Sequence, residues 1–169
     1  MPAAPFESHR DVVQPQWIDH NGHMNVGYYG VVFDLATDGW LAHLGLDDAH
    51  RKAERVTTFT LEAHFTYQRE VLEGERLRFT TQLLAFDEKR IHYFHRMFRE
   101  ADSALAATNE LVSLHVSEES RRGAPMHADV LARIEAVQGE HAKLPAPAEA
   151  GRVIGLRARP TTPQAGRGH

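Results

Sequence analysis

The sequence contains no cysteine among its 169 residues. Disulfide bonds, thiolate metal ligands and a cysteine nucleophile are therefore excluded, and any catalysis must use oxygen and nitrogen side chains. The motifs HExxH and GxSxG are also missing, as is a glycine-rich phosphate loop. His92 and His95 would point to opposite faces of a strand. We therefore expect neither a metal nor a cofactor.

The sequence also lacks a large excess of charge of one sign and lacks long apolar runs. The net charge is -4, and both signs are interspersed without the basic stripe that binding to a phosphate backbone needs, so nucleic acid is not an expected partner. No apolar run approaches the ~18 residues that span a bilayer, so no membrane partner is expected. The first residues, MPAAPFESHR, do not resemble a secretory signal, and we expect a cytoplasmic protein.

One long helix is predicted over residues 26–44, in a chain whose length suits a single core. Its apolar residues have helical spacing: Val26, Tyr29, Phe33, Ala36, Trp40 and Leu44. Further apolar residues lie on the other faces, so we expect the helix to be buried almost all round. Asn25 is a suitable N-cap and Gly45 a suitable C-terminal stop.

Four strands are predicted after a charged connection, over residues 56–67, 76–86, 90–100 and 104–117. Their short spacers predict an antiparallel meander, and a short helix is expected within 126–137. The fold class is therefore α+β, with one antiparallel sheet wrapped around the long helix. We expect residues 1–140 to form this domain and 141–169 a C-terminal extension. In that extension residues 152–156 can dock on the body, and the last ten residues are expected to be disordered.

The stretch WIDHNGHMNVGYY, from Trp17 to Tyr29, places polar residues directly before the helix. An aspartate there, Asp19, lies beside unpaired helix N–H groups that bind anions or a developing oxyanion. Asp19 could attack a thioester carbonyl or act as general base for water, with His23 and Asn21 holding the water or moving its proton. The N–H groups near Val26 and Gly27 would polarise the carbonyl. This juxtaposition suits acyl chemistry.

Each of these residues also has a plain structural interpretation. Asn25 is a natural helix cap, and Gly22 is a natural turn residue. Asp19 could be an Asx-turn residue, while His20 and His23 could be ordinary loop histidines. The residues alone leave both interpretations open.

The run DHNGHMN, from Asp19 to Asn25, with the helix and strands after it, resembles the hotdog-fold acyl thioesterases of the 4-hydroxybenzoyl-CoA thioesterase type. The similarity covers roughly residues 11–137. It implies that Asp19 is the catalytic carboxylate and that the amide at or next to Val26 polarises the thioester. It also implies a homodimer or homotetramer with the site at the subunit interface, and an acyl-CoA substrate.

Two related families supply secondary candidates. The plant acyl-carrier-protein thioesterases have a D-x-N-x-H-x-N pattern, which this sequence matches at Asp19, Asn21, His23 and Asn25. Those enzymes have an acid followed by cysteine after the next strand; here Glu70 matches the acid and Val71 replaces the cysteine, so a thiol has no role. Other hotdog thioesterases use an acid on the central helix, where only Asp34 and Asp38 are available.

Aromatic residues suggest the substrate. We expect Trp17, Tyr28, Tyr29 and Tyr67 to bind the acyl group, and Trp40 and Phe59 to be core. An aromatic pocket suits a small acyl group, an aryl ring or a quaternary ammonium group. The run DHNGHMNVGYY is also similar to thioesterases encoded with, or fused to, carnitine dehydrogenase, which act on betainyl-CoA-type products. We therefore expect hydrolysis of a short or cationic acyl-CoA. The alternatives are an aryl or medium-chain thioesterase, a non-catalytic acyl-CoA binding module and, less favoured, a hotdog hydratase.

Overall fold

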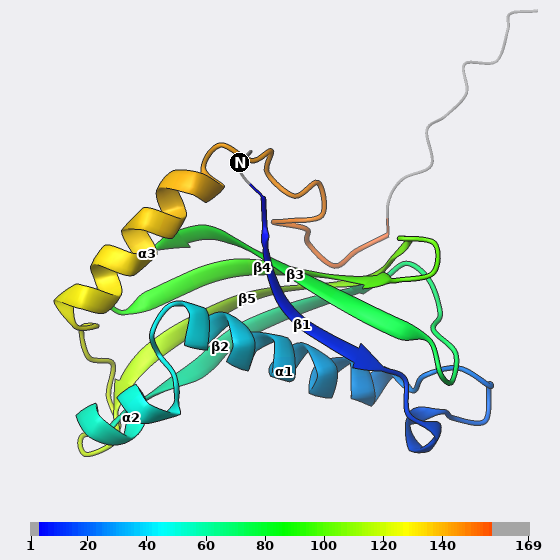
Figure 1. Cartoon of the computed structure of the whole chain (residues 1–169), viewed down its shortest axis with the longest axis horizontal. Coiled ribbons are helices and arrows are strands. Elements are labelled where there is room, and N and C mark those ends of the chain that lie inside the picture. The colour runs from blue at the N-terminus through cyan, green and yellow to red at the C-terminus, as the bar shows by residue number, and fades with distance from the viewer. Residues whose placement is uncertain (1–3, 157–169) are drawn as a thin grey trace, which may run out of the picture.

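One antiparallel sheet and a long helix along one of its faces make up the body of the protein (Figure 1). The computed structural model describes residues 4–156. Within them the strands are β1 (Phe6–Val12), β2 (Val56–Tyr67), β3 (Arg76–Phe86), β4 (Arg90–Arg99) and β5 (Leu105–Ser117). The α-helices are α1 (Val26–His43), α2 (Asp48–Glu54) and α3 (Ala128–His141). The predicted long helix, the four predicted strands and the terminal helix are confirmed.

The order of the strands corrects the predicted meander. The sheet runs β1-β3-β4-β5-β2, so only β3, β4 and β5 are neighbours in chain order. The link 68–75 instead crosses from one side of the sheet to the other, and β2 becomes an edge strand. On its way the link passes the start of α1, where the Met24 N–H donates to the Val71 carbonyl (2.9 Å) and Val71 is fully buried. This contact holds the crossover in place.

Besides the short 3-10 helix Pro15–Trp17, one strand and one α-helix were not predicted. The segment FESHRDV forms β1, which pairs with β3, but its charged residues hide a strand pattern. The charged connection after α1 contains helix α2. Its N-cap is Asp47, whose side chain accepts a hydrogen bond from the His50 N–H (2.9 Å). Both are short and partly exposed, so neither carries a clear apolar period.

The ends of α1 agree with the prediction, but its burial does not. Asn25 caps the helix by accepting from the Gly27 N–H (2.9 Å), and Gly45 follows the C-cap with a φ of 86°. Contrary to expectation, one face is open: the exposed fractions are 50% for Val31 and 40% for Leu35. Phe59, expected in the core, is 37% exposed on β2. A sheet covers only the helix face that it contacts, so apolar residues elsewhere stay exposed.

The core divides into two clusters along α1. Around Tyr29 and Phe33, near the N-terminal end, lies one cluster with Val71 and Phe79. Around Trp40, near the C-terminal end, the second cluster adds residues of α3: Val130 and Ile134. The helix therefore has a different environment at each end.

The C-terminal extension crosses the sheet face opposite α1. The Gln82 side-chain amide donates to the Pro145 carbonyl (3.3 Å), Glu149 pairs with Arg96 (3.5 Å), and the Gly151 N–H donates to Glu110 (2.7 Å). The extension is thus held by residues that precede 152–156. The apolar side chains within 152–156 are exposed. The predicted disordered tail lies outside the described residues. Within residues 4–156, no helix has the length and apolarity needed to span a membrane.

Candidate active site

The loop that precedes α1 is closed by backbone hydrogen bonds. The Asp19 N–H donates to the His23 carbonyl (3.1 Å), and the Gly22 N–H donates to the Asp19 carbonyl (3.0 Å). Gly22 has a φ of 83°, which a residue with a Cβ adopts only under strain. The loop is joined to the segment before it through the Asn25 N–H, which donates to the Trp17 carbonyl (2.8 Å). The polar side chains are therefore held on an ordered turn.

The Asp19 carboxylate is oriented by two donors. One oxygen accepts from the Asn21 N–H (2.8 Å) and the other from the Asn25 side-chain amide (3.3 Å). The Asn21 N–H, followed by the charges of His23 and His20, holds the pKa of Asp19 below its ordinary value. Asp19 is therefore an Asx-turn residue and also an ionised carboxylate at neutral pH. That state suits a base or a nucleophile and not an acid.

Among the first three residues of α1, one backbone N–H is free. The Gly27 N–H is used by the Asn25 side chain, and the Tyr28 N–H donates to the Asn25 carbonyl (3.0 Å). Within residues 4–156, no acceptor is bonded to the Val26 N–H. An unpaired amide at a helix N-terminus favours a partial negative charge. This narrows the expected oxyanion donor from Val26 or Gly27 to Val26.

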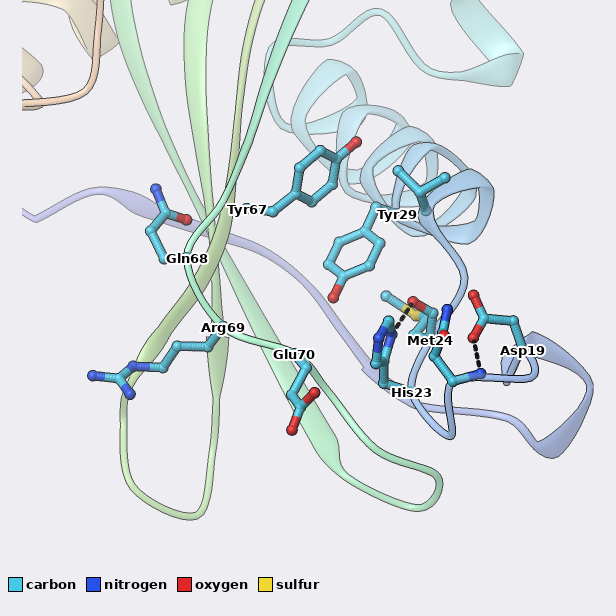
Figure 2. Close-up of a pocket in the computed structure, with 10 residues that line it drawn as sticks. Asp19, His23, Met24, Tyr29, Tyr67, Gln68, Arg69 and Glu70 are labelled. Carbon is cyan, nitrogen blue, oxygen red and sulfur yellow. Dashed lines mark hydrogen bonds between the residues drawn. The ribbon is translucent and has the colours of Figure 1, made fainter. Parts of the chain in front are cut away.

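These groups open into a cavity of about 440 Å³ (Figure 2). Its lining comes from the loop, the start of α1, the end of β2 and the crossover: Asp19, Asn21, His23, Met24, Val26, Tyr29, Tyr67, Gln68, Arg69 and Glu70. Figure 2 shows Asp19 and His23 on the side of the helix N-terminus, with the two tyrosine rings between them and Gln68. Seven of the residues singled out from the sequence thus meet in one place.

The remaining candidates lie outside this lining. Asn25 acts through the hydrogen bonds described above, and Trp17 and Tyr28 stack on each other with ring centroids 5.9 Å apart. Asp34 is exposed on α1 outside the cavity, although partial desolvation of its carboxyl group, and then the nearby Asp38 charge, raises its pKa. Neither acid of the central helix lines the cavity that Asp19 enters.

Two tyrosines form the aromatic wall of the cavity. The rings of Tyr29 and Tyr67 are perpendicular, with an interplanar angle of 83° and centroids 5.0 Å apart. Burial, and then the proximity of Tyr67 and Glu70, raises the pKa of Tyr29 to about 12. Burial also raises the pKa of Tyr67. Both phenols are therefore neutral at physiological pH.

Three lining residues were not foreseen: Met24, Gln68 and Arg69. Met24 is 1% exposed and reads in the sequence as an ordinary core residue. Gln68 and Arg69 begin the crossover, which the sequence presents as a hairpin link. Only the match at Glu70 signalled that this segment belongs to the site. In residues 4–156 no group of three or more His, Asp or Glu side chains is arranged to hold a metal ion.

A carboxylate beside a free helix amide, in a cavity between a central helix and its sheet, is an arrangement suited to the hydrolysis of acyl groups. A sequence model described as the thioesterase-like superfamily matches residues 13–134. The chain therefore belongs to the thioesterase-like superfamily. The resemblance seen in the sequence, the hotdog fold and the expectation of a thioester hydrolase are confirmed.

The chain is also similar to individual proteins. The chain is 44% identical over 144 residues to a betainyl-CoA thioesterase of Pseudomonas aeruginosa, covering 85% of this chain and 91% of that protein. It is 38% identical over 145 residues to an L-carnitine dehydrogenase/betainyl-CoA thioesterase of Rhizobium meliloti, covering 86% of this chain but 29% of that longer protein. A Staphylococcus aureus protein solved in complex with CoA superposes with a TM-score of 0.85 at 28% identity, covering 93% of this chain and 98% of that one.

Proposed function

We propose that this protein hydrolyses a betainyl-CoA-type acyl-CoA to the free acid and CoA, as a step of carnitine-related metabolism. The proposal depends chiefly on one observation: the ionised Asp19 and the free Val26 N–H meet in a cavity with an aromatic wall. The 44% identity to a betainyl-CoA thioesterase supports the choice of acyl group. Because CoA thioesters are intracellular metabolites, we propose the cytoplasm as its compartment.

The proposed chemistry follows from the positions of two groups. The Val26 N–H stabilises the negative charge that develops on the thioester oxygen. Asp19 either accepts a proton from an attacking water or itself attacks the carbonyl carbon, giving an anhydride that water then hydrolyses. In both routes a carbon–oxygen bond forms, the carbon–sulfur bond breaks, and the CoA thiolate takes up a proton.

His23 is the proposed carrier of that proton. In the neutral tautomer with a proton on Nδ1, Nδ1 donates to the Met24 carbonyl oxygen (3.3 Å) and Nε2 is the acceptor. Asn21 lines the same cavity and assists by positioning water. Thus Asp19, His23 and Asn21 are the proposed catalytic residues. Asn25 and Val26 form the proposed binding site for the oxyanion.

We further propose that the active form is a homodimer or homotetramer. Strand β2 ends the sheet, and its side chains Phe59 and Leu61 are exposed, at 37% and 56%. Val31 and Leu35 add an open apolar face on α1. An unpaired edge with apolar neighbours favours association with a second copy. A monomer by light scattering at micromolar concentration would contradict this proposal.

The test of function is thiol release from betainyl-, short-chain, octanoyl- and benzoyl-CoA. Because the chain has no cysteine, a thiol reagent reports only the CoA that is released. We expect betainyl-CoA to be the best substrate and Asp19→Asn to lower turnover by ~100-fold or more, as for the loss of a catalytic acid or base. Asp129→Asn, an exposed aspartate of α3, is the matched control and should retain turnover.

The other outcomes separate the alternatives. Preferred turnover of octanoyl- or benzoyl-CoA would indicate a medium-chain or aryl thioesterase. Binding of the thioesters without turnover would instead indicate a binding module, and equal turnover by Asp19→Asn would remove Asp19 from the mechanism.

A further inference from the structure

We propose that Tyr29, Tyr67 and Glu70 form the subsite that selects a cationic acyl group, with Glu70 acting in specificity and not in catalysis. This inference depends on the proposed function, because it concerns the acyl end of the same substrate. It replaces the expectation of Glu70 as a secondary catalytic acid.

The position of these residues agrees with the size of the acyl group. In a betainyl thioester one methylene group separates the quaternary nitrogen from the reacting carbonyl carbon. A subsite for the nitrogen must therefore share one cavity with Asp19. Tyr29, Tyr67 and Glu70 all line the 440 Å³ cavity that Asp19 enters.

The aromatic pair has the chemistry that a quaternary ammonium group requires. Such a group cannot donate a hydrogen bond, so it is recognised by ring faces and by negative charge. Tyr29 and Tyr67 pack edge to face at 83° to each other, and both line the cavity. Tyr67 is 49% exposed, which leaves its ring accessible to a ligand, whereas Tyr29 is 4% exposed and fixed by the core.

Glu70 supplies an uncommitted negative charge. Its neighbour Glu75 accepts from the Leu72 N–H (2.9 Å) and lies 3.8 Å from Arg99. Glu70, in contrast, has no hydrogen bond or ion pair with any residue between 4 and 156. Its charge nevertheless acts on the Tyr29 hydroxyl, since it contributes to the raised pKa of that group. Arg99 is near enough for the Glu70 charge to contribute to its raised pKa, but it forms ion pairs with Glu75 and Asp102 and not with Glu70. A carboxylate without a direct ion pair, in a cavity with two neutral rings, attracts a cation.

The one cation in the lining does not oppose this arrangement. Figure 2 shows the Arg69 side chain extending away from the tyrosine rings, on the far side of the crossover. Glu70 lies further along the same segment and nearer to His23 in this view, with its carboxylate pointing away from the two rings. The negative residue of the crossover thus lies closer to the catalytic loop than its positive residue does.

An apolar acyl group would also fit against two rings, so the experiment must isolate charge. We would compare betainyl-CoA with 3,3-dimethylbutanoyl-CoA, in which carbon replaces the quaternary nitrogen and the shape is kept. The measured quantity is the ratio of the two kcat/KM values. For the wild type we expect a preference for the cationic substrate of roughly tenfold or more, the range of a desolvated cation–π contact with an added charge.

Three variants and one control define the subsite. Glu70→Gln and Tyr67→Leu should each lower the preference by about threefold or more, whereas Tyr67→Phe keeps the ring and should keep the preference. Glu73→Gln removes an exposed carboxylate of the same crossover that does not line the cavity, and it should also keep the preference.

The outcomes distinguish this inference from the proposed function. If both substrates are hydrolysed but Glu70→Gln and Tyr67→Leu leave the ratio unchanged, the subsite is wrong while the thioesterase stands. A wild type without preference for the cation would likewise overturn the subsite. If neither substrate is hydrolysed, the proposed function fails, and the inference fails with it.

Discussion

The two ends of α1 have opposite characters. At the C-terminal end Trp40 and Leu44 are fully buried, and α3 closes the core around them. At the N-terminal end the helix begins in an exposed polar loop, where Asp19 and Asn25 share a hydrogen bond of 3.3 Å. Both ends contribute to the core, but only the N-terminal end also carries the polar groups of the site. Substitutions at the two ends should therefore affect different properties.

The largest effect is expected at the buried end. Trp40→Ala removes the largest of the fully buried side chains. Because the surrounding core cannot fill the space, the free energy of unfolding should fall by about 3–5 kcal/mol, measured by urea denaturation. Val31→Ala, on the exposed face of the same helix, is the control and should cost far less. A loss below about 1 kcal/mol for Trp40→Ala would mean that the buried end is not the stabilising one.

A second effect concerns pH and the middle of the helix. His95 is fully buried beneath α1, where its ring nitrogens bond to Thr37 (3.1 Å) and Thr81 (2.7 Å). Burial lowers the pKa of His95 from 6.5 to about 3. The unfolded chain therefore binds a proton below pH 6.5 that the folded protein does not. Stability should be constant with respect to this group above pH 6.5 and should fall by up to about 1.4 kcal/mol per pH unit between 6.5 and 3.

The check is the pH dependence of the urea midpoint in the wild type and in His95→Gln. Burial also lowers the pKa values of His43, His115 and His141. The stability of the variant should therefore still fall with decreasing pH, but less steeply than that of the wild type, by the contribution of about one proton. Equal slopes in the two proteins would contradict a neutral, buried His95.

The smallest effect is expected at the helix cap, where the two properties meet. Asn25→Ala removes the acceptor for the Gly27 N–H and should cost about 1 kcal/mol of stability. It also removes the side-chain donor to Asp19, so turnover should fall as well. Asn25→Ser can restore the cap but not that donor. We expect the serine variant to recover stability without recovering turnover, and recovery of both would remove Asn25 from the positioning of Asp19.

The same comparison explains what the sequence could predict. The periodicity of α1 and its capping residues are local features, and both ends were placed within one residue of the structure. The pairing of β2 with β5 is set by contacts far apart in the chain, and the short link before β3 concealed it. Burial of α1 was overestimated at Val31 and Leu35 because a pattern of apolar residues does not show which face the sheet covers.

In the site too, local features could be predicted from the sequence, whereas contacts between distant segments could not. Asp19, Asn21 and His23 lie within one loop, and their proximity could be seen in the sequence. Gln68 and Arg69 reach the cavity only because the crossover passes the start of α1, which a meander does not provide. Trp17 and Tyr28 were expected in the pocket because they flank the motif, but they pack against each other instead.

The central claim is that the Asp19 side chain serves chemistry and contributes little to stability. The most direct test measures thiol release from betainyl-CoA and the urea midpoint on the same preparations of the wild type and Asp19→Asn. We predict that turnover falls by ~100-fold or more while the midpoint is unchanged. Retained turnover, or a loss of turnover that only parallels a loss of the folded state, would contradict the claim.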